Sequence, residues 1–156
     1  MEIRPITPRD RGPLAALLGR IETFSPQEVD CALELVDLAI RPSNPDYQIL
    51  VAVQGGQLAG YVCYGPTPMT VGTFDLYWIA SDPSARGQGV GSALVAAMEA
   101  DLRERQGRVV RVETSAQEAY GPTRGFYAAL NYREEARFRD FYKAGEDLII
   151  LSKRLE

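Results

Sequence analysis

The spacing of apolar residues predicts a chain of short strands and amphipathic helices. A strand is expected over residues 2–6, followed by a helix that begins at Pro8 and carries Leu14 and Leu17 on one face. Apolar runs bounded by Gly, Pro or Asn predict the later strands. These strands are expected at residues 48–53, 58–64, 73–80, 109–114, 132–142 and 147–153, with further helices at 91–105 and 122–130.

Local signals fix the second helix and two hairpins. A Ser-Pro-Gln-Glu capping box at residues 25–28 begins the helix, and Pro42 and Pro45 end it. The Gly-Gly pair at 55–56 and the Ala-Gly pair at 144–145 each join two strand-like runs, as in a tight β-hairpin. Neighbouring strands at both places are therefore expected to be antiparallel.

The resulting order is βααβββαβαββ, and the fold class is α/β with a mixed sheet. Hairpins followed by a β-helix-β unit imply a mostly antiparallel central sheet with helices on both faces. No internal repeat, linker or low-complexity tract interrupts the 156 residues. A single domain over residues 1–156 is expected.

Composition narrows the function classes. The net charge of −4 argues against a nucleic-acid partner and favours a cationic or amine-bearing one. The chain has no histidine, which excludes His-based triads and His-ligated metals, and no CxxC spacing suggests zinc. Cys31 and Cys63 are expected to be small buried hydrophobes rather than reactive thiols. No signal peptide or membrane span is recognisable, so a cytoplasmic location without membrane contact is expected.

The run Asp-Pro-Ser-Ala-Arg-Gly-Gln-Gly-Val-Gly-Ser at residues 82–92 carries the main chemical signal. It lies between a predicted strand and a predicted helix, and its three glycines leave backbone N–H groups uncovered. A helix N-terminus with bare amides favours an anion, because the unpaired donors and the helix dipole both attract negative charge. The run therefore indicates a site for a phosphorylated cofactor.

Three glycine-loop patterns could account for this run. A P-loop requires a Lys after the glycines, and none follows. A dinucleotide fingerprint requires a third glycine where Ser92 stands. The third pattern, R-x-x-G-x-G, is matched by Arg86, Gly89 and Gly91. A nucleotide-binding protein is accordingly disfavoured.

The R-x-x-G-x-G pattern resembles the acetyl-CoA motif of the GNAT superfamily of N-acetyltransferases. The predicted element order also resembles the GNAT order, and residues 125–132 (Gly-Phe-Tyr-Ala-Ala-Leu-Asn-Tyr) resemble a late helix segment of that family. The resemblance implies direct transfer of an acetyl group from acetyl-CoA to a primary amine, on a small molecule, a peptide N-terminus or a lysine. A non-catalytic acyl-CoA-binding or regulatory module of the same fold is the alternative. The family also suggests a homodimer.

The expected cofactor site follows from this resemblance and from the bare amides. In the family, the strand before the loop carries a bulge, and its freed backbone groups bind the pantetheine arm. Tyr120 stands where many members carry an Asn that binds the pantetheine side, which leaves that contact open. Trp78 is expected in the core rather than against the cofactor. The predicted cofactor-binding residues are Ile79, Ser81, Arg86, Gly87, Gln88, Gly89, Val90, Gly91, Ser92, Tyr120, Thr123 and Tyr127.

Tyr127 matches the family's general acid, which protonates the leaving sulfur; a purely structural aromatic is its other interpretation. Asp75 lies near the position where several members place a general base, and it is also expected to contact the acceptor. A solvent-facing strand carboxylate is the alternative for Asp75. Glu113 and a water relay are further possibilities for the base.

Acceptor specificity is expected to come from the N-terminal helices, their joining loop and the late hairpin, which flank the acceptor in the family. Glu22, Phe24 and Tyr142 are the predicted substrate-binding residues there, together with Asp75. Glu22 has a second interpretation as an ordinary solvated loop carboxylate. The sequence does not name the amine.

Overall fold

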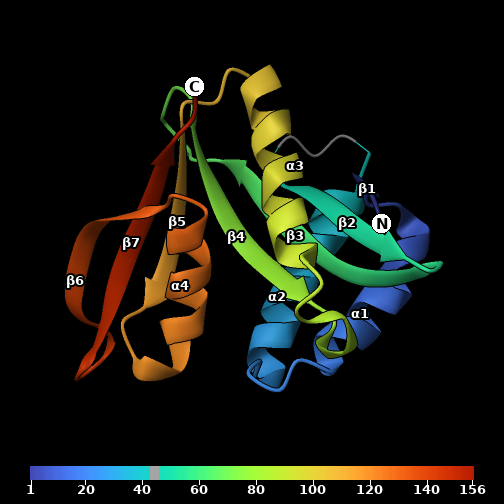
Figure 1. Cartoon of the computed structure of the whole chain (residues 1–156), viewed down its shortest axis with the longest axis horizontal. Coiled ribbons are helices and arrows are strands. Elements are labelled where there is room, and N and C mark those ends of the chain that lie inside the picture. The colour runs from blue at the N-terminus through green and yellow to red at the C-terminus, as the bar shows by residue number, and fades with distance from the viewer. Residues whose placement is uncertain (43–45) are drawn as a thin grey trace.

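The computed structural model describes residues 1–42 and 46–156. Within these residues, seven strands form one sheet, and helices lie on both of its faces (Figure 1). The expected helix end at Pro42 agrees with the structure, whereas Pro45 lies outside the described residues. The elements are β1 (Glu2–Pro5), η1 (Pro8–Asp10), α1 (Arg11–Gly19), α2 (Pro26–Ile40), β2 (Gln48–Gln54), β3 (Gln57–Pro66), β4 (Thr73–Ser81), η2 (Pro83–Ala85), α3 (Val90–Glu104), β5 (Val109–Ser115), η3 (Glu118–Tyr120), α4 (Gly121–Ala129), β6 (Arg133–Lys143) and β7 (Glu146–Arg154).

The sheet has the strand order β1-β2-β3-β4-β5-β7-β6. The β4–β5 pair is parallel, and the other neighbouring pairs among the described strands are antiparallel. The prediction of a mixed, mostly antiparallel sheet is confirmed. The parallel pair follows from α3, because a helix between two strands returns the chain in the same direction.

Each face of the sheet buries its own apolar cluster. Leu14 and Val36 of α1 and α2 pack with Tyr61 on one face. Leu94 and Met98 of α3 pack on the other face with residues of β4, β5 and β7. The periodicity of the sequence therefore identified the buried face of each helix, because residues three and four apart lie on one side of a helix.

The local signals at the helix start and the first hairpin are also confirmed. The N–H of Glu28 donates to Ser25 Oγ at 3.1 Å, and the N–H of Ser25 donates to Glu28 Oε1 at 3.1 Å. Gly55 and Gly56 adopt φ values of 59° and 77°, which a tight hairpin requires and which glycine adopts without strain.

The two strands β4 and β5 separate along their length, and this separation creates the site. They pair only from Thr73–Val109 to Leu76–Val112. Beyond Leu76, β4 continues beside β3 and β5 continues beside β7, so the two strands diverge (Figure 1). Tyr77 is an extra residue in β4, because Leu76 and Trp78 oppose the consecutive residues Tyr64 and Cys63. The expected bulge is confirmed, and it bends β4 away from its parallel neighbour.

Other sequence expectations have mixed outcomes. Cys63 is buried, and burial raises the pKa of its thiol to about 12. Cys31 is exposed on α2, so the prediction that both cysteines are buried is wrong for this one. Among the described residues, no helix is long and apolar enough to cross a bilayer, and His, Cys, Asp and Glu side chains form no group arranged for a metal. The homodimer stays a prediction.

Candidate active site

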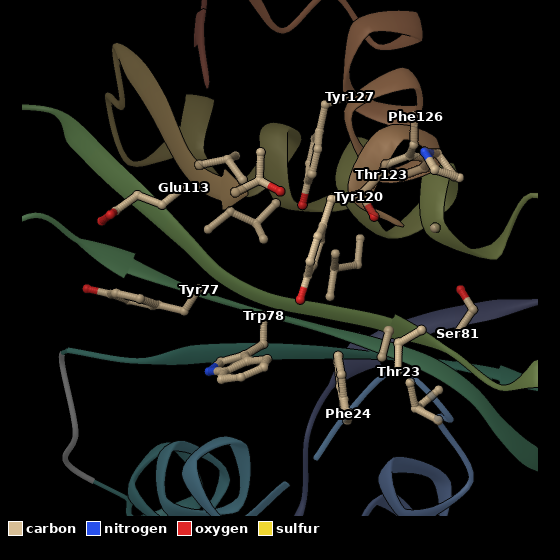
Figure 2. A pocket seen from close by; sticks show the side chains of 18 of the residues that line it. Thr23, Phe24, Tyr77, Trp78, Ser81, Glu113, Tyr120, Thr123, Phe126 and Tyr127 are labelled. Carbon is tan, nitrogen blue, oxygen red and sulfur yellow. The ribbon is translucent and has the colours of Figure 1, made fainter. Parts of the chain in front are cut away.

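A pocket of about 490 Å³ lies where β4 and β5 separate. Side chains of β4 and β5 form its walls together with α4, η3 and the loop between α1 and α2 (Figure 2). Arg86 and Gly91 line it at the side of the glycine run, whereas Phe24 and Glu113 line it elsewhere. The pocket therefore joins the predicted cofactor loop to the predicted acceptor side.

Tyr127 lies deepest among the polar side chains of this pocket. The residue is only 2% exposed, and its hydroxyl points into the pocket (Figure 2). Its ring packs edge-on against Phe126 and Tyr132, with centroid distances of 5.2 and 5.5 Å. No residue in the described parts of the chain forms a hydrogen bond with its hydroxyl. Burial raises the pKa of Tyr127 above its ordinary value, so the phenol keeps its proton at neutral pH.

The positions of the run require glycine for different structural reasons. Gly87 and Gly89 adopt φ values of 81° and 76°, and a Cβ on either would meet open space. Gly91 lies in α3, where a Cβ would come within 3.1 Å of the Phe126 ring. The first two positions therefore need glycine for backbone conformation, and Gly91 needs it for the packing of α3 against α4.

The helix that follows the run leaves bare amides, as the sequence predicted. Gly89 is the N-cap of α3, so the N–H groups of Val90, Gly91 and Ser92 have no partner within the helix. The N–H of Gln88 donates to the carbonyl of Ala85 at 3.3 Å, which takes it out of the expected cradle. The anion site stays a prediction, and the bare amides in the first turn of α3 support it.

Ile79 and Ser81 lie on the part of β4 that has separated from β5. Both line the pocket, and both pair with β3 on the other side of the strand. Among the described strands, none pairs with this stretch of β4 on the side of β5. Its backbone groups there are open to a ligand that extends along the strand.

Comparison with known proteins identifies the family. A model described as the acetyltransferase (GNAT) family matches residues 17–132. The chain belongs to the GNAT family. A solved structure assigned to the same family, from Desulfovibrio desulfuricans, is 38% identical, with a TM-score of 0.94 and coverage of 99% of each chain. No curated protein matches this GNAT chain.

More distant solved structures share the fold of this GNAT chain. The ribosomal-protein-S18-alanine N-acetyltransferase of Escherichia coli has 22% identity and a TM-score of 0.78, and the match covers 99% of this chain and 94% of that one. An aminoglycoside 6′-N-acetyltransferase complexed with coenzyme A has 18% identity and a TM-score of 0.79, with 100% and 98% covered. The expected GNAT fold is therefore confirmed.

GNAT proteins use acetyl-CoA, which is the cofactor of this chain. The residues present fit such a molecule. The bare amides of Val90, Gly91 and Ser92 suit its phosphates, and the open backbone at Gly87 and Gly89 leaves room for them. The unpaired side of β4 suits an extended arm that carries amide groups.

The predicted role of Asp75 does not agree with its surroundings. Its carboxylate is buried and accepts hydrogen bonds from Arg111 Nε at 2.6 Å and from Thr67 Oγ1 at 2.8 Å. Asp75 is absent from the pocket lining, so its catalytic and acceptor-binding roles stay predictions without support from its position. The alternative of a solvent-facing carboxylate is wrong as well. Asp75 cross-links the paired ends of β4 and β5.

The expected acceptor residues are only partly brought together. Phe24 lines the pocket and packs edge-on against Trp78, with a centroid distance of 5.5 Å. Trp78 joins the core, as expected, and also lines the pocket. Glu22 and Tyr142 are exposed and lie outside the pocket lining. Glu113, the weaker candidate for the base, lines it.

Several remaining predictions concern residues around the cofactor. Tyr120 and Thr123 line the pocket, so their predicted cofactor contacts stay open. Among the residues of the glycine run, Arg86 and Gly91 line the pocket; Gly87, Gln88, Gly89, Val90 and Ser92 lie outside its lining.

Other pocket residues were not recognised from the sequence. The sequence indicates a role for Glu28 in the capping box only, and the structure shows that this residue also lines the pocket. Tyr77 was not recognised because it is the bulge residue, whose side chain breaks the alternation of the strand. Phe126 was placed only in the family's late helix segment, and its packing against Gly91 depends on the tertiary fold.

Proposed function

We propose that this GNAT protein transfers the acetyl group of acetyl-CoA to a primary amine by direct attack on the thioester. The observation that carries this proposal is the position of Tyr127, a buried residue whose hydroxyl points into the pocket beside the separated part of β4. No residue in the described parts of the chain pairs with this hydroxyl, so it is free to donate a proton to a ligand in the pocket, as the leaving thiolate of acetyl transfer requires.

Tyr127 holds a proton in the position of the family's general acid. Its raised pKa keeps the hydroxyl protonated, and the edge-on contacts with Phe126 and Tyr132 fix the ring. When bound, acetyl-CoA supplies the acetyl thioester. The chain itself contributes a proton donor at Tyr127 Oη and an apolar wall that excludes water, including Phe24 and Trp78.

Glu113 is the proposed proton acceptor for the amine. It lines the pocket, and no residue in the described parts of the chain forms an ion pair with its carboxylate. Figure 2 shows this carboxylate on the same side of the pocket as the hydroxyl of Tyr77. The occupied carboxylate of Asp75 is less suited to this role, because its oxygens already accept hydrogen bonds from Arg111 and Thr67.

The test measures thiol release from acetyl-CoA in the presence of primary amines, with cofactor affinity measured separately by calorimetry. Tyr127→Phe is expected to lower kcat by about 100-fold or more while the affinity for acetyl-CoA changes little. Glu113→Gln is expected to lower kcat, because it removes the proposed proton acceptor. Gly89→Glu is the contrasting variant and is expected to weaken cofactor binding, because it adds a negative charge and strains a residue at φ 76°.

The outcomes separate catalysis from binding. Acetyl-CoA binding without thiol release from any amine would instead support the non-catalytic module. Unchanged turnover in Tyr127→Phe would remove this residue as the acid, and unchanged affinity in Gly89→Glu would remove the assigned phosphate site.

A further inference from the structure

The charged side chains that line the pocket come from different elements of the fold. Arg86 is the cation of the lining and belongs to the glycine run, where phosphates are expected. Glu28 at the start of α2 and Glu113 in β5 are the lining carboxylates. The carboxylates of the lining thus lie outside the glycine run, and the lining cation belongs to it.

These carboxylates have capacity left for a ligand. Glu28 Oε1 accepts the N–H of Ser25 at 3.1 Å, and its other oxygen has no partner in the described parts of the chain. Glu113 forms no ion pair there either. The charge of Glu113 contributes to the raised pKa of Arg111. The guanidinium of Arg111 nevertheless donates its hydrogen bond to Asp75 Oδ1, at 2.6 Å.

Two phenols lie within reach of the same negative charge. Burial raises the pKa of Tyr120, and the charges of Glu28 and Glu146 raise it further. Burial likewise raises the pKa of Tyr142, with added effects of Glu113 and Glu146. Glu28 and Glu146 therefore act on Tyr120, whereas Glu113 and Glu146 act on Tyr142.

Aromatic faces complete the acceptor side. Phe24, Trp78, Tyr77 and Tyr120 line the pocket together with the carboxylates, and such faces attract ammonium groups as well as alkyl chains. The hydroxyl of Tyr127 points into the same space (Figure 2) and forms no hydrogen bond within the described parts of the chain, so it is free to contact a ligand there.

We propose that the acceptor carries a second positive charge in addition to the amine that is acetylated. Glu28 binds this second charge against the aromatic wall, while the reacting amine lies between Glu113 and Tyr127. The inference rests on the proposed function. It names one chemistry, a primary amine with a further cationic group, which both a diamine and a basic peptide N-terminus contain.

The experiment compares acceptors of equal length in the thiol-release assay. Cadaverine carries a second ammonium, pentylamine carries none, and 5-aminovalerate carries a carboxylate. We expect kcat/KM for cadaverine to exceed that for pentylamine by roughly fivefold or more, beyond the factor of two from its two equivalent amines. 5-Aminovalerate is expected to be the poorest acceptor. The dipeptide amides Ala-Arg and Ala-Gln, compared in the same way, separate the peptide source from the small-molecule source.

Glu28→Gln tests the assigned carboxylate without removing the helix cap, because Gln also completes a capping box. This variant is expected to lower kcat/KM for cadaverine by about three- to tenfold, and to lower that for pentylamine by a clearly smaller factor. Asp30→Asn is the matched control, since Asp30 is exposed on the same helix and outside the pocket lining. It should change neither value.

Two results would overturn the inference and leave the proposed function intact. One is equal use of pentylamine and cadaverine, and the other is an equal loss for both amines in Glu28→Gln. Acetyl-CoA binding without acetylation of any amine would instead refute the proposed function, and the inference with it.

Discussion

Tyr61 buries a phenol hydroxyl that has no hydrogen-bond partner among the described residues. The side chain lies in β3, fully buried against α1 and α2. Tyr64 offers a matched comparison on the same strand. It is buried in the cluster on the other face of the sheet, and its hydroxyl donates to Asp101 at 2.6 Å. Tyr61→Phe and Tyr64→Phe therefore remove the same atom from opposite hydrogen-bonding situations.

The expected effects have opposite signs. An unpaired buried hydroxyl costs about 1–3 kcal/mol, and removal of one oxygen forfeits a few contacts of about 0.1–0.2 kcal/mol each. Tyr61→Phe should therefore raise the free energy of unfolding by about 1 kcal/mol. Tyr64→Phe breaks a hydrogen bond to a charged group and should lower it by about 1.5 kcal/mol or more. For 156 residues, 1 kcal/mol corresponds to about 3 °C in Tm.

Urea unfolding and thermal scans of the wild type and both variants measure these differences. An unchanged dependence on urea concentration would show that only stability has altered. The reasoning is refuted if Tyr61→Phe destabilises the protein as much as Tyr64→Phe does. That result would mean that the hydroxyl of Tyr61 is satisfied in solution.

Two further predictions concern ion pairs. Lys153 Nζ lies 2.9 Å from Oε1 of Glu99, and the Glu99 side chain is only 7% exposed. Lys153→Met should therefore lower the free energy of unfolding, measured with urea, by about 3 kcal/mol. Arg103, 3.7 Å from Glu99, limits this loss of stability because it leaves the carboxylate with one cation. A decrease of less than about 1 kcal/mol in the free energy of unfolding would contradict a buried ion pair. The Arg20 guanidinium makes the largest contribution to the low pKa of Asp82, and hydrogen bonds from the N–H and hydroxyl of Ser84 add to it. Together they lower this pKa from 3.8 to about 2. Because the folded-state pKa is depressed, this stabilisation is present above pH 4 and is lost as the pH falls from about 4 to about 2. The stability difference between wild type and Asp82→Asn should shrink across that interval, and a constant difference would exclude this ion pair as its cause.

The sequence by itself determined the elements and their order. Short-range physics controls these features: apolar residues three and four apart form one helix face, a capping box uses residues three apart, and glycine relieves a strained turn. The box of Ser25 and Glu28 and the hairpin at Gly55 needed no distant partner to be predicted. The bare amides after Gly89 were predictable for the same reason, because the first turn of any helix lacks acceptors for its N–H groups.

Only the tertiary structure decided which side chains share the pocket. Asp75 pairs with Arg111 across the β4–β5 contact, and the sequence gives no sign of this partner for its carboxylate. Glu28 and Glu113 line one pocket although 85 positions separate them in the chain. The bulge at Tyr77 shifts the alternation of β4 by one residue, so the strand pattern alone could not show which of its side chains enter the site. Such placements depend on strand register and helix packing, which join distant residues and leave no periodic signal in the sequence.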